Sequence, residues 1–254
     1  MIVIYEHPFT ERVRLWLKLE QIFLGLRFDL HNKISKSVTV NLFKILELLD
    51  LFSAYDIKSD LLKELTNRER SLYVLVNNPA VDQKRLSGTL KKINHLKITL
   101  KNTSPLFSEE MRKSELLSAA KQSSPLISGP AKVDSPLLKY WLSQSSLFQL
   151  ETIEKMFMNF NPFCEALSII LALLRESSIP IEVIARNGKF ERAITEKNNI
   201  ILLRIALKKD DDCFPEFLGN KHRIQIKFLN FEVDSIKPKQ LNDTINFKLS
   251  TFFF

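Results

Sequence analysis

The sequence contains little glycine and little cysteine. Only five glycines occur in 254 residues. Scarce glycine, together with apolar residues spaced three and four apart, favours helices. The two cysteines, Cys164 and Cys213, lie in unrelated contexts and are too few for a disulfide framework. This excludes the small disulfide-stapled secreted proteins and indicates a reducing compartment.

The sequence also lacks the patterns of common catalytic and metal sites. Its four histidines (His7, His31, His95 and His222) are scattered, with no pair at metal-ligand spacing. There is no glycine-rich phosphate loop, no serine nucleophile elbow and no HExxH motif. The acidic run 210–212 lacks the glycine and distal glutamate of a calcium loop, so we interpret it as a solvated hairpin tip. We therefore expect no catalytic residue, no cofactor and no metal.

Targeting and membrane-spanning segments are not predicted either. The N-terminus has no basic segment leading into a long apolar run, so it does not resemble a signal peptide. The most apolar stretch, Ala166 to Leu174, is about half a bilayer span and is flanked by Glu165 and Arg175. We expect a buried helix there, in a cytoplasmic protein.

The periodicity of apolar residues changes near residue 178. Before that point the 3.6-residue period predicts helices, and after it alternation predicts strands, with Asn187-Gly188 as a type I′ hairpin turn. The sequence thus predicts an α+β fold: an N-terminal all-helical domain, 1–178, and a C-terminal antiparallel β domain, 179–254. The run Ile2 to Tyr5 is a candidate extra strand of the sheet. Helices are expected near 10–26, 42–52, 60 to about 77, 82–93, 108–121, 148–160 and 163–175, a short apolar turn at 137–142, and strands near 181–186, 189–194, 200–207, 223–228 and 244–252. Ser59-Asp60 is the predicted N-cap of the third helix, and Asp82 is that of the fourth.

The first predicted helix has two apolar sides. Trp16 and Leu24 belong to one stripe, and Leu19 and Leu26 belong to another. Two apolar sides indicate burial between two bodies, such as the core and a partner subunit.

Basic residues exceed acidic residues by 37 to 29, which gives a net charge of +8. The excess favours an anionic partner: nucleic acid, an acidic membrane surface or an acidic peptide. Strand alternation predicts one positive sheet face, and helix spacing predicts a basic ridge at Arg14 and Lys18, which Glu11 and Glu20 could neutralise. Ordinary solubilising charge is the alternative for each residue. The sheet-face candidates are Lys189, Arg192, Arg204, Lys208, Lys221, Arg223 and Lys227, and two more, Lys121 and Lys139, bracket a Pro/Gly loop at 123–135.

Six segments together resemble the ZapD family of bacterial cell-division proteins. They occur in family order along nearly the whole chain, and none would be specific alone. The segments are Tyr5 to Glu20, Asp60 to Leu65, Val81 to Gln83, Pro136 with Trp141-Leu142, Asn161-Pro162 with Leu173 to Arg175, and Phe214 to Arg223.

The resemblance implies a non-enzymatic protein that forms a symmetric dimer through its helical part. It also implies a positive pocket near the α/β junction that takes the C-terminal tail of the division protein FtsZ, so that a dimer bundles filaments at midcell. Lys18 stands where the family has arginine, and Lys139 where it has histidine. A nucleic-acid-binding protein is the alternative, although the sequence shows no helix-turn-helix and no aromatic stacking pattern. The implied pocket residues are Arg14, Lys18, Lys121, Lys139, Lys221, Arg223 and Lys227.

Overall fold

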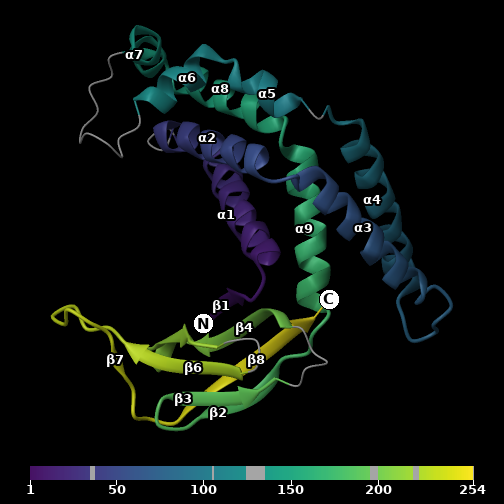
Figure 1. Cartoon of the computed structure of the whole chain (residues 1–254), viewed down its shortest axis with the longest axis vertical. Helices are drawn as coiled ribbons and strands as arrows, with labels where there is room; N and C mark the ends of the chain where they lie inside the picture. Colours follow the sequence, from purple (N-terminus) through teal and green to yellow (C-terminus); the bar gives the residue numbers. More distant parts are fainter. Residues whose placement is uncertain (35–37, 105, 124–134, 195–199, 220–222, 254) are drawn as a thin grey trace. The chain divides into compact units, whose positions relative to one another are not determined.

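The chain folds into two compact units. A computed structural model describes residues 1–34, 38–104, 106–123, 135–194, 200–219 and 223–253 (Figure 1). One unit is helical and comprises Leu17–Leu171; the other combines Met1–Trp16 with Ala172–Phe254 and contains the strands. The predicted α+β class is confirmed, with helices in the N-terminal and central chain and antiparallel sheets after them.

The helices pack through apolar faces and, near residue 160, through a group of phenylalanines. The rings of Phe52, Phe107, Phe160 and Phe163 lie 4.7–5.5 Å apart between centroids, a spacing at which aromatic pairs attract. This cluster joins α2, α5 and α9. The helices are α1 (Glu11–His31), α2 (Val38–Ala54), α3 (Ile57–Tyr73), α4 (Gln83–Asn102), α5 (Phe107–Arg112), α6 (Glu115–Gln122), α7 (Pro136–Ser143), α8 (Ser146–Met158) and α9 (Asn161–Glu176).

Side-chain caps fix several helix starts. The Asp82 carboxylate accepts a hydrogen bond from the Arg85 amide at 3.0 Å, which confirms the predicted cap of α4. The predicted cap of α3 at 59–60 was wrong, because Asp56 caps that helix by accepting from the Ser59 amide at 3.1 Å. The cap of α3 therefore lies about one turn earlier in the chain than predicted.

The predicted helix 108–121 is in fact two helices, and the predicted turn 137–142 is a third. Ser114 has an extended backbone (ψ 120°) between α5 and α6, and serine favours that position before a helix over a helix interior. Pro136 occupies the first turn of α7, where its missing N–H costs nothing. Most of the predicted loop at 123–135 lies outside the described residues.

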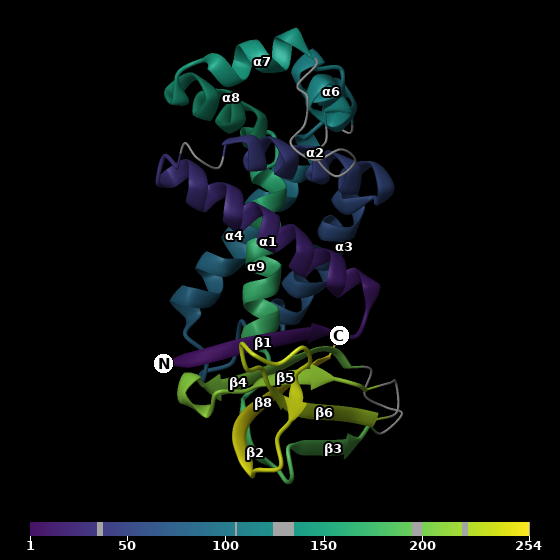
Figure 2. The same ribbon diagram turned by 90° about the vertical axis from the view of Figure 1, so that its left-hand side faces the viewer.

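The described strands form two four-stranded sheets (Figure 2), and residues from both sheets contribute to one apolar core. The first sheet has the order β1-β4-β8-β2. The second has the order β3-β6-β5, with β7 paired to β6. β1 pairs with β4 from Ile2 opposite Lys208 to Pro8 opposite Leu202. The strands are β1 (Ile2–Pro8), β2 (Ile181–Ala185), β3 (Lys189–Ala193), β4 (Ile200–Lys208), β5 (Phe214–Phe217), β6 (Arg223–Asn230), β7 (Lys239–Gln240) and β8 (Ile245–Phe253).

The hairpin between β2 and β3 turns at Asn187 and Gly188, as predicted. Their φ angles are 51° and 65°, the two positive values that a type I′ turn needs. A Cβ at Gly188 would lie 2.0 Å from the Leu241 carbonyl oxygen. Only glycine fits this position.

Two expectations for the β region need correction. The strands at 200–208 and 223–230 belong to different sheets, so Arg204 and Lys208 do not share a face with Arg223 and Lys227. The acidic run 210–212 is not a hairpin tip, because it connects β4 and β5, which belong to different sheets. Its first two residues lie in a short 3-10 turn (Lys209–Asp211), in which an Asp211 carboxylate oxygen accepts from the Lys208 amide at 3.0 Å.

A half-buried charge network ties the N-terminal strand to its own unit. Glu6 of β1 accepts from Arg175 of α9 at 2.7 Å and from Arg204 of β4 at 2.7 Å, and Arg204 also lies over the Phe252 ring. Burial raises the pKa of Glu6, but the two arginines outweigh that effect and hold the pKa below its usual value. Phe252 itself is 1% exposed beneath Arg204, whereas its neighbour Phe253 is 39% exposed.

We predict that Glu6→Gln lowers the free energy of unfolding by roughly 2–3 kcal/mol at pH 7, because two arginines lose their carboxylate. Since the folded pKa is depressed, this stabilisation is present above the unfolded pKa of about 4.3 and is lost as pH falls through the folded pKa. Urea unfolding at pH 7 and about pH 3 measures the difference.

The matched control is Glu182→Gln on β2. Its carboxylate lies 3.8 Å from Lys248 and is 85% exposed, so the ion pair contributes little. If both variants shift the urea midpoint equally, or if the Glu6 effect does not shrink in acid, the Glu6 network does not stabilise the β unit as described.

Candidate anion-binding surface

Two carboxylates on α2 arrange basic side chains from neighbouring helices. Glu47 pairs with Lys18 of α1 at 2.8 Å, and Asp50 pairs with Lys121 of α6 at 3.2 Å and with Arg112 of α5 at 3.0 Å. Because Glu47 and Asp50 are three residues apart on a helix, they are neighbours on one side of it. The fold therefore brings two of the predicted residues, Lys18 and Lys121, to the same side of α2.

Arg112 makes the most contacts in this group, and one of its N–H donors has no partner in the described part of the chain. One of its terminal nitrogens donates to the Leu49 carbonyl at 2.6 Å and to Asp50 at 3.0 Å. Its Nε is buried and has no acceptor among the described residues. A buried donor of this kind is costly unless something accepts from it. The residue was not among those predicted, because nothing in its local sequence distinguishes it.

A hollow of about 70 Å³ lies between these helices, lined by Asp50, Arg112 and Lys121 together with Leu46, Leu49, Leu117 and Ser118. Burial raises the pKa of Asp50, but Lys121 and Arg112 outweigh that effect and lower it. Asp50 is ionised at neutral pH and pairs with both cations. The exposed N–H groups of Arg112 and Lys121 can donate hydrogen bonds to a further carboxylate, with apolar Leu46, Leu49 and Leu117 beside it.

Lys139 lies on α7, which packs against α6. Its side chain is exposed and forms no ion pair with any residue that the structure describes. It is thus a neighbour of the helix that carries Lys121, and its ammonium group is available.

The other predicted residues belong to the strand-containing unit. Arg14 pairs with Glu11 at 3.2 Å within α1, and Arg223 pairs with Glu191 of β3. Lys227 stands between Lys189 and Glu216 on neighbouring strands. The outer face of this sheet is therefore mixed in sign rather than positive as predicted. Lys221 lies outside the described residues. That all seven residues form one pocket stays a prediction.

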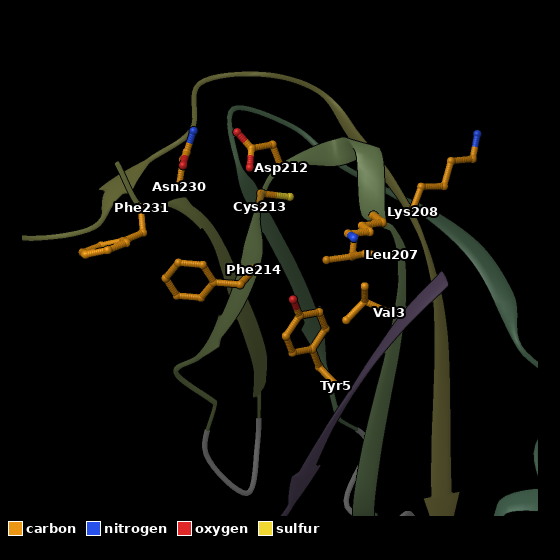
Figure 3. A pocket seen from close by; sticks show the side chains of 10 residues that line it. Val3, Tyr5, Leu207, Lys208, Asp212, Cys213, Phe214, Asn230 and Phe231 are labelled. Atoms are coloured by element: carbon orange, nitrogen blue, oxygen red, sulfur yellow. The ribbon is translucent and has the colours of Figure 1, made fainter. Parts of the chain in front are cut away.

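Another hollow lies in the strand-containing unit, and the thiol that lines it is not a reactive nucleophile. It measures about 230 Å³ and is lined by Tyr5, Cys213 and Phe214, with Lys208 at its margin (Figure 3). Burial, then Asp211 and Asp212, raise the pKa of the Cys213 thiol to about 11. At neutral pH the sulfur is a protonated thiol, which is a poor nucleophile.

The part of the chain that the structure describes contains neither a cluster of metal ligands nor a single membrane-spanning helix. No group of three or more His, Cys, Asp or Glu residues there could hold a metal ion. No single helix there is long and apolar enough to cross a membrane. Together α8 and α9 have the necessary length and composition, but they are bent by 65° relative to each other.

Comparison with known proteins gives consistent results. The family model of ZapD, described as a cell division protein, matches residues 17–227. The cell division protein ZapD of Janthinobacterium sp. (strain Marseille) is 28% identical over 253 residues, covering 100% of both chains. The proteins of the same name from Coxiella burnetii (strain RSA 331 / Henzerling II) and Escherichia coli O9:H4 (strain HS) are each 26% identical over 249 residues. Those matches cover 98% of this chain and 96% and 98% of the relatives.

Proposed function

The chain belongs to the ZapD family of cell division proteins, and we propose that it binds the C-terminal tail of FtsZ and, as a dimer, crosslinks FtsZ filaments. The observation that carries this proposal is the group of cations along α2. Lys18, Arg112 and Lys121 pair there with Glu47 and Asp50, and the side chains of Lys18 and Lys121 are at least half exposed.

In this proposal, carboxylates of the tail bind Arg112 and Lys121, and Lys18 and Lys139 add positive charge to the approach. The fixed cations steer an acidic peptide and make its association fast and sensitive to salt. Leu46, Leu49 and Leu117 offer apolar contact beside the charges. Arg14, Lys221, Arg223 and Lys227 remain proposed contributors from the strand-containing unit.

An apolar stripe on α1 supports dimerisation. Leu19 and Leu26 are buried in the core, whereas Leu24 and Phe28 are 57% and 62% exposed on another side of the helix. Large apolar side chains four residues apart on a surface favour burial by a partner. A second copy that covers this stripe would give two tail sites per dimer, and two weak sites crosslink filaments through multivalency. The proposed location is the cytoplasmic side of the midcell division site.

Tail binding is tested by sedimenting the protein with polymerised FtsZ. We expect the full-length polymer to pellet the protein and form bundles, and FtsZ without its C-terminal tail to leave the protein in the supernatant. Equal pelleting with the tailless polymer would contradict tail recognition. It would place the contact on the body of the filament.

We further predict that Lys18→Glu and Lys139→Glu each weaken bundling several-fold, because they reverse charge where acidic tails approach. Neither should lower the melting temperature, since Lys139 is exposed and the Lys18–Glu47 pair is half-exposed. Light scattering of FtsZ bundles measures the effect. The matched control is Lys155→Glu, which makes the same charge change at an exposed position of α8 and should bundle normally. If the control loses as much bundling, only net charge matters.

A further inference from the structure

The helix α4 carries an unusual concentration of positive charge. Its twenty residues include six Lys and Arg and no Asp or Glu. The segment 57–102, which contains α3 and α4, has ten basic and four acidic residues, so it holds six of the eight net positive charges of the chain. This charge run is visible in the sequence, yet it lies outside the predicted pocket. The basic residues of α4 are Lys84, Arg85, Lys91, Lys92, Lys97 and Lys101.

Only part of this charge serves the fold. Lys97 pairs with Glu69 of α3 at 2.5 Å. From α3, the Lys58 ammonium group caps the end of α4 by donating to the carbonyls of Lys101 and Thr103. By contrast, four lysines are exposed and form no ion pair with any described residue. They are Lys84, Lys91, Lys92 and Lys101.

The same face of α4 has a glycine with no role in the packing of the chain. Gly88 is four residues from both Lys84 and Lys92, so these side chains surround it on the helix surface. A Cβ at Gly88 would meet no atom within 4 Å. Glycine weakens a helix interior, and here the bare backbone leaves space for a partner to approach closely between the lysines.

We propose that this face of α4 binds duplex nucleic acid through the phosphate backbone. Lysines, with serine and asparagine beside them, are typical of contacts to phosphate oxygens that do not read sequence. A helix of twenty residues is about 30 Å long, and duplex DNA carries about one charge per 1.7 Å of its axis. Lys84, Lys91 and Lys92 lie within roughly 100° of one another around the helix, on the side that carries Gly88, whereas Lys101 is turned roughly 100° away from Lys84. Three lysines therefore face the same row of phosphates.

Three other anionic partners fit this face less well. A protein interface usually has aromatic anchors and few lysines at its centre, and α4 contains no Phe, Tyr or Trp. Single strands bind by stacking on such rings. A membrane-surface helix inserts its apolar face, but in α4 that face is buried: Leu86, Ile93, Leu96 and Leu100 are each at most 5% exposed.

The test is fluorescence anisotropy with a labelled 30-base-pair DNA of arbitrary sequence, titrated over a range of salt concentrations. The wild-type protein should bind with a log–log salt slope of about −3, as expected for three neutralised phosphates. Lys91→Glu combined with Lys92→Glu should weaken binding at least tenfold and reduce the slope by about 2. Gly88→Gln, which changes no charge, should also weaken binding because it fills the gap between the lysines.

The matched control combines Lys155→Glu with Lys237→Glu, the same charge change at exposed positions outside α3 and α4, and should bind within about twofold of wild type. Equal loss in this control would overturn the proposal, as would no binding at low salt. Competition by anionic vesicles or polyglutamate as strong as by unlabelled duplex would assign the face to a membrane or an acidic protein instead. The Lys91/Lys92 double variant should still sediment with FtsZ, which separates this site from tail binding.

Discussion

Pairing of α2 carboxylates with cations from other helices is the interaction on which the proposed binding surface depends. Glu47 and Asp50 pair with Lys18, Arg112 and Lys121, and the Leu49 carbonyl also binds Arg112, so less side-chain freedom is lost at Arg112 when an anion arrives. Asp50 is ionised near neutrality, and its two cations lower its pKa further. The surface therefore presents both signs of charge and one ordered cation, Arg112. The buried Nε of Arg112 has no acceptor among the described residues.

Features encoded over a few residues could be predicted from the sequence. The Asp82 cap and the Asn187-Gly188 turn depend only on neighbouring residues, and both are confirmed. The helix-then-strand order follows from the change in apolar period. Strand partners could not be predicted, because alternation shows which face of a strand is buried but not which sheet it joins. That is why β4 and β6 were assigned to one face when they belong to different sheets.

The site was predictable only in part for the same reason. Lys18 and Lys121 were selected individually, but each depends on an acid of α2 that is far away in the sequence. Arg112 gains its importance from the Leu49 carbonyl, which only the folded chain places beside it. The basic face of α4 is the opposite case, since its charge run needs no structure to be seen. Cations of the helical unit thus lie on two surfaces. Those along α2 are paired with acids, whereas the exposed lysines of α4 form no ion pair with any described residue. We therefore propose a different partner for each surface.

Binding of the tail along α2 is tested most directly by the acetylation rates of individual lysines with and without an FtsZ tail peptide, read by mass spectrometry. Lys18 and Lys121 should become several-fold less reactive when the peptide is bound, while Lys155 and Lys91 should be unchanged. If the peptide binds and Lys121 keeps its full reactivity, the tail does not occupy the α2 surface.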